Sequence, residues 1–220
     1  MWHDALHRCA LHRRARGCLA GSSVLGLGSR LVAERLPGDL RLRLAGPADI
    51  APVVDLVESA YRGDASRVGW TSEADLLDGR RTDADAVGLL VSEPGGMVVL
   101  AERAERAGEL VGCYHLRLEP GASAYFGMFA VRPDAQGRGI GARLLDDAER
   151  RALEVLGASR LRMTVLAPRG ELIAFYGRRG FTATGETEPF PDAGGRVGVP
   201  RVSGLRFVVL AKSLAGKAGE

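Results

Sequence analysis

Residues 131–141 read Val-Arg-Pro-Asp-Ala-Gln-Gly-Arg-Gly-Ile-Gly and join an apolar run to a long amphipathic segment. Gly137, Gly139 and Gly141 lack the side chains that would keep an anion away from the backbone. A helix N-terminus that follows such a turn presents unpaired N–H groups and a partial positive charge. The stretch therefore predicts a pyrophosphate-binding turn between a strand and a helix, where Arg138 adds a full charge. The alternative is an ordinary glycine-rich turn.

The kind of phosphate ligand is a separate question. Gly137-x-Gly139-x-x-Ala142 formally matches the dinucleotide fingerprint, which also needs an acidic residue about 20 residues further on. Residues 160–165 read Arg-Leu-Arg-Met-Thr-Val and contain no acid. Since no Gly-Lys-Ser/Thr follows the glycines, a P-loop is excluded. A nicotinamide-dependent oxidoreductase remains a disfavoured alternative.

Periodicity predicts an alternation of strands and helices on both sides of this turn. Strands are expected at residues 40–44, 97–101, 110–118, 124–131, 161–166, 181–184 and 205–214. Helices are expected at residues 49–61, 72–79, 139–156 and 171–179. The fold class expected is therefore α/β.

The chain resembles the GCN5-related N-acetyltransferases (the GNAT superfamily) over roughly residues 39–213. The family's acetyl-CoA motif, V-x-P-x-x-Q-x-x-G-I-G after a strand, is matched by Val131, Pro133, Gln136, Gly139, Ile140 and Gly141. A second element, a helix leading to Gly-Phe, is matched less fully by Ala174, Tyr176, Gly180 and Phe181. The resemblance implies a twisted, mixed, mostly antiparallel sheet of about 6–7 strands, splayed at the acetyl-CoA site and flanked by helices.

The resemblance also implies which residues meet the cofactor. Backbone N–H groups of residues 136–141 would bind the pyrophosphate, and the exposed edge of the preceding strand would bind the pantetheine arm. One backbone N–H there would polarise the thioester carbonyl. The implied cofactor-binding residues are Phe129, Ala130, Val131, Gln136, Gly137, Arg138, Gly139, Ile140, Gly141 and Ala142.

Tyr176 matches the tyrosine that protonates the departing CoA thiolate in many members of this family. A phenol has a suitable pKa for that role if it points at the sulfur. The alternative is a core aromatic, because Leu172 and Tyr176 form an i, i+4 pair. One departure from the family pattern is Arg169, which stands where an asparagine is common; Arg169 could meet a CoA phosphate instead.

The acceptor amine must lose a proton before or during attack, and a carboxylate is the expected helper. Candidate acceptor-site residues come from the first two expected helices and the loop between them: Glu58, Tyr61, Trp70 and Glu73. Glu73 lies at the start of an expected helix, where the helix dipole alone favours an acid, and Glu58 could simply face solvent.

Composition limits the alternatives for the whole chain. The 220 residues carry a net charge of +3, and residues 1–36 hold six arginines against two acids, so the rest is nearly neutral. Nucleic-acid binding is therefore disfavoured. No apolar run of about 18 residues occurs, so no membrane partner is expected. Three widely spaced cysteines indicate neither a metal site nor a disulfide framework and fit a cytoplasmic protein.

Two regions are expected in the chain. Residues 1–36 lack sustained periodicity and are expected to be a poorly ordered extension, a leader, or a segment upstream of the true translation start. Residues 37–220 are expected to form a single acetyltransferase-like domain.

The function predicted is acetyl transfer from acetyl-CoA, without a metal, directly to a small-molecule or peptide amine. A non-catalytic acyl-CoA-binding module is the alternative. The resemblance leaves a homodimer possible.

Overall fold

The computed structural model describes residues 34–36, 40–106, 108–191 and 198–214. Expectations for residues 1–33 lie outside this described part. The elements run in the order β1 (Glu34–Leu36), β2 (Leu40–Leu44), η2 (Pro47–Asp49), α2 (Ile50–Tyr61), η3 (Asp64–Val68), β3 (Leu77–Asp78), α3 (Ala84–Val91), β4 (Gly96–Arg103), β5 (Leu110–Glu119), β6 (Ser123–Val131), η4 (Pro133–Ala135), α4 (Ile140–Glu154), β7 (Arg160–Leu166), α5 (Gly170–Gly177), β8 (Thr182–Pro189), β9 (Val199–Pro200) and β10 (Arg206–Ser213).

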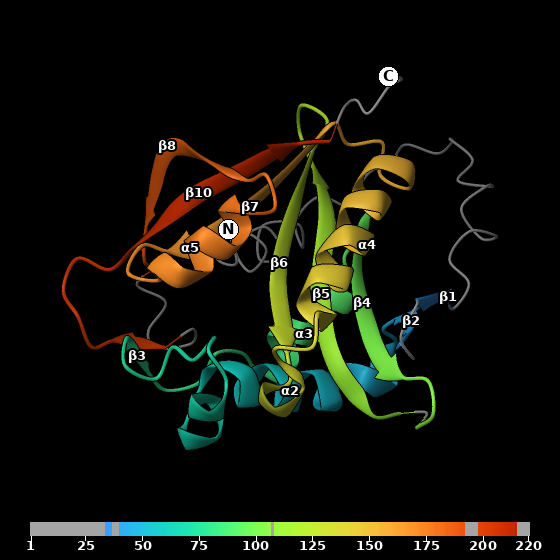
Figure 1. Ribbon diagram of the computed structural model, residues 1–220, viewed down its shortest axis with the longest axis horizontal. Helices are drawn as coiled ribbons and strands as arrows, with labels where there is room; N and C mark the ends of the chain where they lie inside the picture. The colour runs from blue at the N-terminus through green and yellow to red at the C-terminus, as the bar shows by residue number, and fades with distance from the viewer. Residues whose placement is uncertain (1–33, 37–39, 107, 192–197, 215–220) are drawn as a thin grey trace, which may run out of the picture.

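The main sheet has the strand order β1-β2-β4-β5-β6-β7-β10-β8 (Figure 1). All its pairs are antiparallel except β6 with β7. The predicted fold class, a mixed and mostly antiparallel sheet with flanking helices, is confirmed. Within the described residues the sheet has eight strands, because β1 pairs with β2 at its edge. Strands β3 and β9 form a separate two-stranded sheet.

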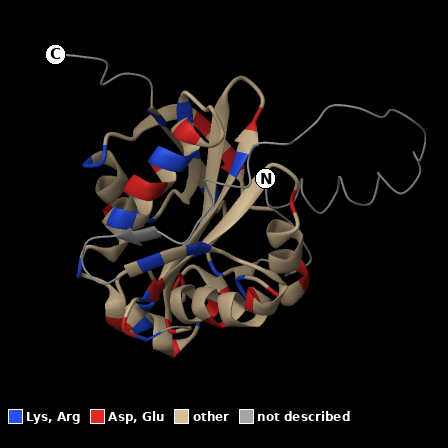
Figure 2. Ribbon diagram, turned by 90° about the vertical axis from the view of Figure 1, so that its right-hand side faces the viewer, with Lys and Arg blue, Asp and Glu red and all other residues tan. Residues whose placement is uncertain are grey.

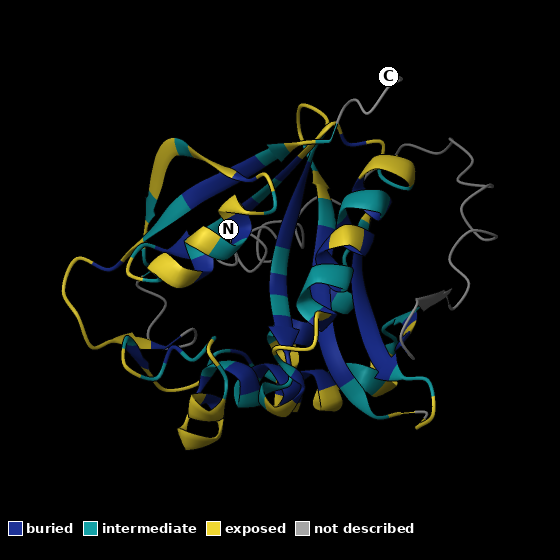
Figure 3. Ribbon diagram, in the orientation of Figure 1, coloured by how far each residue is buried: buried dark blue, intermediate teal, exposed yellow. Residues whose placement is uncertain are grey.

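Helices cover both faces of the sheet. Successive residues of β4 alternate between two cores: Met97 and Val99 pack in the cluster that includes α4 and α5, whereas Val98 and Leu100 pack against α2 and α3. Central strands that are buried on both faces read as continuous apolar runs. Figure 3 shows this burial through β4, β5 and β6.

The parallel pair β6–β7 opens after three residue pairs. The register runs only from Ser123↔Arg160 to Tyr125↔Arg162, although both strands continue well beyond these residues. On its other side, β6 shifts register against β5 at Met128, which has a positive φ of 43°. A bulge of this kind bends the strand and turns neighbouring groups to new directions. The fork between β6 and β7 therefore lies next to a distorted stretch of β6.

One expected helix is wrong. Residues 72–79 contain turns and β3, and the helix in this region is α3, further along the chain. The side chain of Asp83 caps α3 by accepting a hydrogen bond from the Ala86 N–H at 2.8 Å. Glu73 is instead a buried residue of the loop before β3. A helix dipole therefore does not explain why an acidic residue stands at this position.

Candidate active site

The turn from β6 to α4 has the geometry of an anion cradle. Gly137 and Gly139 have φ values of 75° and 77°, which favour glycine, and Gly139 is the N-cap of the 15-residue helix α4. A Cβ at either position would meet no atom within 4 Å, so the space before the turn is open. Arg138 is exposed beside it. These features fit a bound pyrophosphate.

A cavity of about 220 Å³ adjoins this turn. It is lined by Gly137, Gly139, Gly141 and Ala142 from the turn and α4, and by Val131 at the end of β6. Its other wall comes from the loop after η3, with Trp70 and Thr71, from Phe175 of α5, and from Arg179 in the turn after α5, together with residues described below. We call it the cofactor-side cavity.

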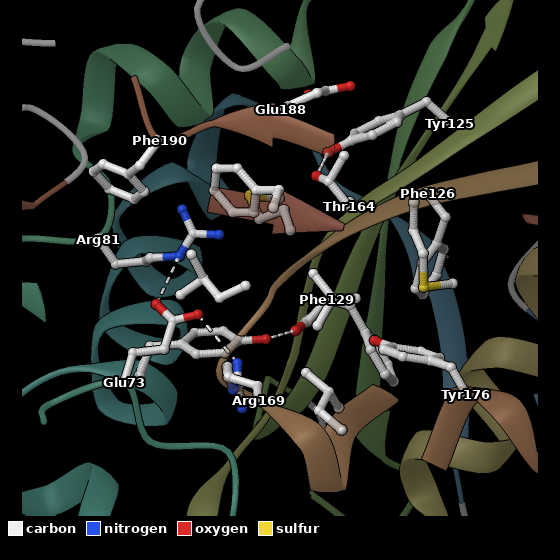
Figure 4. Close-up of a pocket in the computed structure, with 18 of the residues that line it drawn as sticks. Glu73, Arg81, Tyr125, Phe126, Phe129, Thr164, Arg169, Tyr176, Glu188 and Phe190 are labelled. Atoms are coloured by element: carbon white, nitrogen blue, oxygen red, sulfur yellow. Dashed lines mark hydrogen bonds and ion pairs between the residues drawn. The ribbon is translucent and has the colours of Figure 1, made fainter. Parts of the chain in front are cut away.

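A second cavity of about 120 Å³ lies in the fork of the sheet. Its lining includes Tyr125 and Gly127 of β6, Met163 and Thr164 of β7, and Phe190 after β8 (Figure 4). We call it the acceptor-side cavity. The two cavities share four lining residues: Tyr61, Phe129, Leu172 and Tyr176. A group that passes between two bound molecules would cross at this shared wall.

Tyr176 lies on α5 in this shared wall. Its side chain is buried, and its ring contacts those of Phe175 and Phe181 at centroid distances of 5.3 and 5.8 Å. Figure 4 shows its hydroxyl directed toward Phe129. Burial raises the pKa of Tyr176 above its ordinary value, so the phenol keeps its proton at neutral pH.

Tyr61 approaches the same place from the C-terminal end of α2. Its hydroxyl donates a hydrogen bond to the carbonyl oxygen of Phe129. Burial raises the pKa of Tyr61 to about 12. Tyr61 is therefore neutral at physiological pH, and it donates its hydrogen bond to the backbone of β6.

The backbone of β6 faces the fork at Phe129 and Val131. The Arg132 N–H donates to Val111 O on β5, so in the trans peptide the Val131 carbonyl points the opposite way, toward the fork. Groups two residues apart in a strand face the same edge, which places Phe129 on this edge as well. Ala130 lies between these two residues, and its side chain is buried in the core.

The side chain of Gln136 forms hydrogen bonds with other parts of the protein. Its Nε2 donates to Val131 O and Thr71 Oγ1, each at 2.9 Å, and its Oε1 accepts from the Trp70 N–H at 3.0 Å. A Cβ on Gly69 would lie 2.7 Å from Gln136 Oε1, so a larger residue there would displace the Gln136 amide. Gln136 thus joins the loop after η3 to the glycine turn, and it lines the cofactor-side cavity.

Glu73 lies at the centre of an arginine cluster next to the acceptor-side cavity. Its carboxylate is 2.6 Å from Arg62 Nη1, 3.1 Å from Arg169 Nη1 and 3.5 Å from Arg81 Nε. Burial alone would raise the pKa of Glu73, but the three guanidinium groups outweigh it and lower the pKa. Glu73 is therefore a stable anion and a weak base.

Arg169 belongs to this cluster and does not line the cavity at the glycine turn. Its Nη2 donates to Thr71 O at 2.7 Å, and its guanidinium lies 5.7 Å from the centre of the Tyr61 ring. The interpretation that it meets a CoA phosphate receives no support from this position.

The predicted acceptor residues Glu58 and Trp70 and the predicted cofactor-binding residue Ile140 lie in different places. The Glu58 carboxylate accepts hydrogen bonds from the backbone N–H groups of Arg81 and Thr82, at 2.6 and 2.8 Å. Trp70 is 44% exposed and lines the cofactor-side cavity, where its ring is 5.6 Å from that of Phe175. Ile140 is buried in the core at the start of α4.

Sequence reasoning missed two groups of residues. Arg81 lines the acceptor-side cavity, and Phe175 and Arg179 line the cofactor-side cavity. Arg81 follows a turn with no local pattern, so no sequence signal was available for it. The adjacent tyrosine motif could have indicated Phe175 and Arg179.

Two negative findings apply to the described residues. They contain no group of three or more His, Cys, Asp or Glu side chains that could hold a metal ion. In the same part of the chain, no helix is long and apolar enough to cross a membrane. Figure 2 shows basic and acidic residues interspersed over the ribbon in that view.

Comparison with known proteins places this site in a family context. The sequence model of the acetyltransferase (GNAT) family matches residues 56–181. No curated protein matches the chain in sequence.

Several solved structures are similar. A protein assigned as a phosphinothricin N-acetyltransferase has a TM-score of 0.59 and 20% identity, over 80% of this chain and 99% of that chain. Spermidine N-acetyltransferase from Vibrio cholerae, in complex with CoA and spermine, has a TM-score of 0.59 and 15% identity, over 80% and 96%. YncA from Salmonella typhimurium, with acetyl-CoA, has a TM-score of 0.57 and 22% identity, over 83% and 98%. At these identities the similarity shows a shared fold.

Proposed function

Since the chain belongs to the acetyltransferase (GNAT) family, we propose that it transfers the acetyl group of acetyl-CoA directly to the amine of a small molecule. Family and fold make the protein an acetyl-CoA-dependent acyltransferase. The observation that carries the proposal is the wall shared by the two cavities. It puts Tyr61, Phe129, Leu172 and Tyr176 between the cavity at the glycine turn and the cavity in the fork.

Residues of the turn would hold the cofactor. Backbone N–H groups at the start of α4 bind the pyrophosphate, and Arg138 adds charge at the surface. The Phe129 and Val131 N–H groups lie on the same strand edge as their carbonyls, and the Val131 N–H binds the amide-bearing arm. Bound acetyl-CoA would supply a thioester: the amine nitrogen bonds to the acetyl carbon as the carbon–sulfur bond breaks, and the proton that the nitrogen then loses ends on the departing sulfur, which leaves as a thiol.

Two groups of the shared wall serve the transfer. The Phe129 N–H donates to the thioester oxygen, as an oxyanion-hole donor does. The Tyr176 phenol donates to the sulfur as negative charge develops there. Because its pKa is raised, Tyr176 acts more as a hydrogen-bond donor than as a group that ionises.

The acceptor reaches the wall from the fork. Glu73 holds arginines in place and, with its lowered pKa, takes no proton from the amine. The ammonium proton passes to water before attack, so the rate is expected to rise with pH through the pKa of the acceptor amine.

The test is calorimetric titration of the full chain with acetyl-CoA, CoA and NAD, followed by a thiol-release assay with an amine panel. We expect saturable acetyl-CoA binding, no NAD binding and amine-dependent thiol release. NAD binding alone would overturn the cofactor assignment. Acetyl-CoA binding without release for any amine would support the non-catalytic binding module instead.

A further inference from the structure

The stretch of β6 at Met128 and Phe129 lies outside the ladders that β6 forms with its two neighbouring strands. On one side, the register with β7 ends at Tyr125. On the other side, the register with β5 passes from Gly127 directly to Ala130. Within the described strands, Met128 and Phe129 therefore have no paired residue on either neighbour. Ladder hydrogen bonds fix the direction of each peptide group in a sheet, so another interaction must orient these two peptides.

Two side chains donate hydrogen bonds to this part of the backbone. The Cys113 thiol donates to the Met128 carbonyl oxygen at 3.5 Å. In a trans peptide the N–H points opposite to the C=O, so the Phe129 N–H points away from Cys113, toward the fork. The Tyr61 hydroxyl donates to the Phe129 carbonyl oxygen (Figure 4). Because a thiol is a weak donor, Tyr61 provides the stronger of the two bonds.

Tyr61 is itself fixed at its backbone and at its ring. Its carbonyl oxygen accepts a hydrogen bond from the Glu73 N–H at 3.0 Å. The guanidinium groups of Arg81 and Arg169 lie 5.6 and 5.7 Å from the centre of its ring, within the range of a cation–π contact. Both guanidinium groups also pair with the Glu73 carboxylate. The hydroxyl is therefore presented to β6 by a side chain that is already held in place.

The direction of the Phe129 N–H matters because this group is the proposed donor to the thioester oxygen. An oxyanion-hole donor is effective when it is aimed in advance at the atom where charge develops. The hydrogen bond from Tyr61 restricts the peptide that follows Phe129, and with it the backbone torsion at Phe129. Loss of this bond would let the strand relax between its two ladders, although the N–H itself would remain.

We propose that Tyr61 is a positioning residue of the acetyl transfer, and that its hydrogen bond to the Phe129 carbonyl keeps the Phe129 N–H aimed at the thioester oxygen. The proposal rests on the acetyltransferase function proposed above. It gives Tyr61 a role in the arrangement of β6, whereas the sequence suggested a place in the acceptor site.

The first test uses full-length Tyr61→Phe, which removes the hydroxyl and keeps the ring beside Arg81 and Arg169. Thiol release is measured with the amine that wild type acetylates fastest. Complete loss of an oxyanion-hole donor costs about 100- to 1,000-fold in kcat, and a misdirected donor should cost less, about 10- to 100-fold. The KM for acetyl-CoA and its calorimetric affinity should stay within about twofold, because the interaction acts in the transition state.

Tyr114→Phe is the matched control. Tyr114 is also a buried tyrosine whose hydroxyl donates a hydrogen bond, in this case to Asp147, and it lines neither cavity. Each variant leaves a buried oxygen without one donor, so each should lower the melting temperature modestly. Only Tyr61→Phe should lower kcat, and an equal loss of kcat in both variants would overturn the proposal.

The second test observes the thioester carbonyl and does not depend on turnover. Acetyl-CoA labelled isotopically at the acetyl carbonyl carbon is bound to wild type and to both variants without an amine, and infrared difference spectra are recorded. A hydrogen bond to the carbonyl oxygen weakens the C=O bond and lowers its stretching frequency. We expect a lower frequency in wild type and in Tyr114→Phe than in Tyr61→Phe.

The outcomes separate the two proposals. An unchanged kcat in Tyr61→Phe, a change in KM alone, or equal carbonyl frequencies in wild type and Tyr61→Phe overturns the positioning role and leaves the acetyltransferase standing. Failure of wild type to bind acetyl-CoA overturns the proposed function itself.

Discussion

At the scale of single residues, burial decides what Tyr176 can do. A phenol with a raised pKa does not readily give a proton completely to a thiolate, but it can stabilise the developing charge through a hydrogen bond. The role proposed for Tyr176 therefore rests on its place between the two cavities more than on its acidity.

Tyr176→Phe is expected to lower kcat on the order of 100-fold, because the donor to the leaving sulfur is lost while the ring stays packed. The affinity for acetyl-CoA, measured by calorimetry, should stay nearly constant, and so should the melting temperature. An unchanged kcat would show that Tyr176 is a core aromatic.

Gly139 offers a comparison between two glycines at opposite ends of α4. Gly139 and Gly157 both have positive φ, 77° and 66°, and a Cβ at either meets nothing within 4 Å. Gly139→Val and Gly157→Val should therefore each reduce the free energy of unfolding by about 1–3 kcal/mol through backbone strain. Acetyl-CoA binding should be lost in Gly139→Val alone; equal affinities in the two variants would contradict the cradle.

At the scale of elements, the Glu73 cluster joins segments that are distant in sequence. Arg62 follows α2, Arg81 precedes α3, and Arg169 is the N-cap of α5. One buried carboxylate therefore fixes three sides of the acceptor-side cavity.

Glu73→Gln should reduce the free energy of unfolding at pH 7 by about 3–5 kcal/mol, because three guanidinium groups lose their shared anion. Asp75→Asn is the control: Asp75 is exposed and pairs with Arg67 at 2.9 Å, so its loss should change stability little. Since the pKa of Glu73 is lowered by folding, the gap between wild type and Glu73→Gln should close as the pH falls through that value. Chemical denaturation at several pH values measures this difference in the free energy of unfolding.

Local elements were predictable where the signal was local. Strand β6, the glycine turn and α4 can each be predicted from residues that are adjacent in the sequence, and the structure contains all three. The helix expected at residues 72–79 is wrong because acids near a serine suggested a cap, while the real cap is Asp83. Partners that are far apart in the chain, such as Glu73 with Arg169 or Gln136 with Trp70, have no sequence signature, so the cluster and the Gln136 contacts could not be predicted.

At the scale of the whole molecule, buried ionisable groups set the pH range of stability. Hydrogen bonds with Arg43 lower the pKa of Asp49, and the Glu73 pKa is also lowered. Stability from these acids is present above their unfolded pKa values and is lost as the pH falls through the folded ones. Burial raises the pKa of Tyr61 and of Cys113, each to about 12, so stability from these groups is present below their unfolded pKa values and is lost as the pH rises toward about 12.

The melting temperature is therefore expected to have a plateau from roughly pH 5 to pH 8, with a fall on each side. Scanning calorimetry across pH 3–11 measures it. Cys113→Ser should lessen the alkaline fall, because a serine hydroxyl does not titrate in this range. A profile that kept rising above pH 9 would contradict the buried neutral groups.

The open edge of β6 also bears on how copies of the protein behave toward one another. A strand edge with unpaired backbone groups is a template for another chain and promotes aggregation. Here the Phe129 and Val131 carbonyls on that edge accept hydrogen bonds from Tyr61 and Gln136. These two side chains occupy acceptors that a foreign strand would otherwise pair with, so we expect the open edge in the fork to resist edge-to-edge self-association.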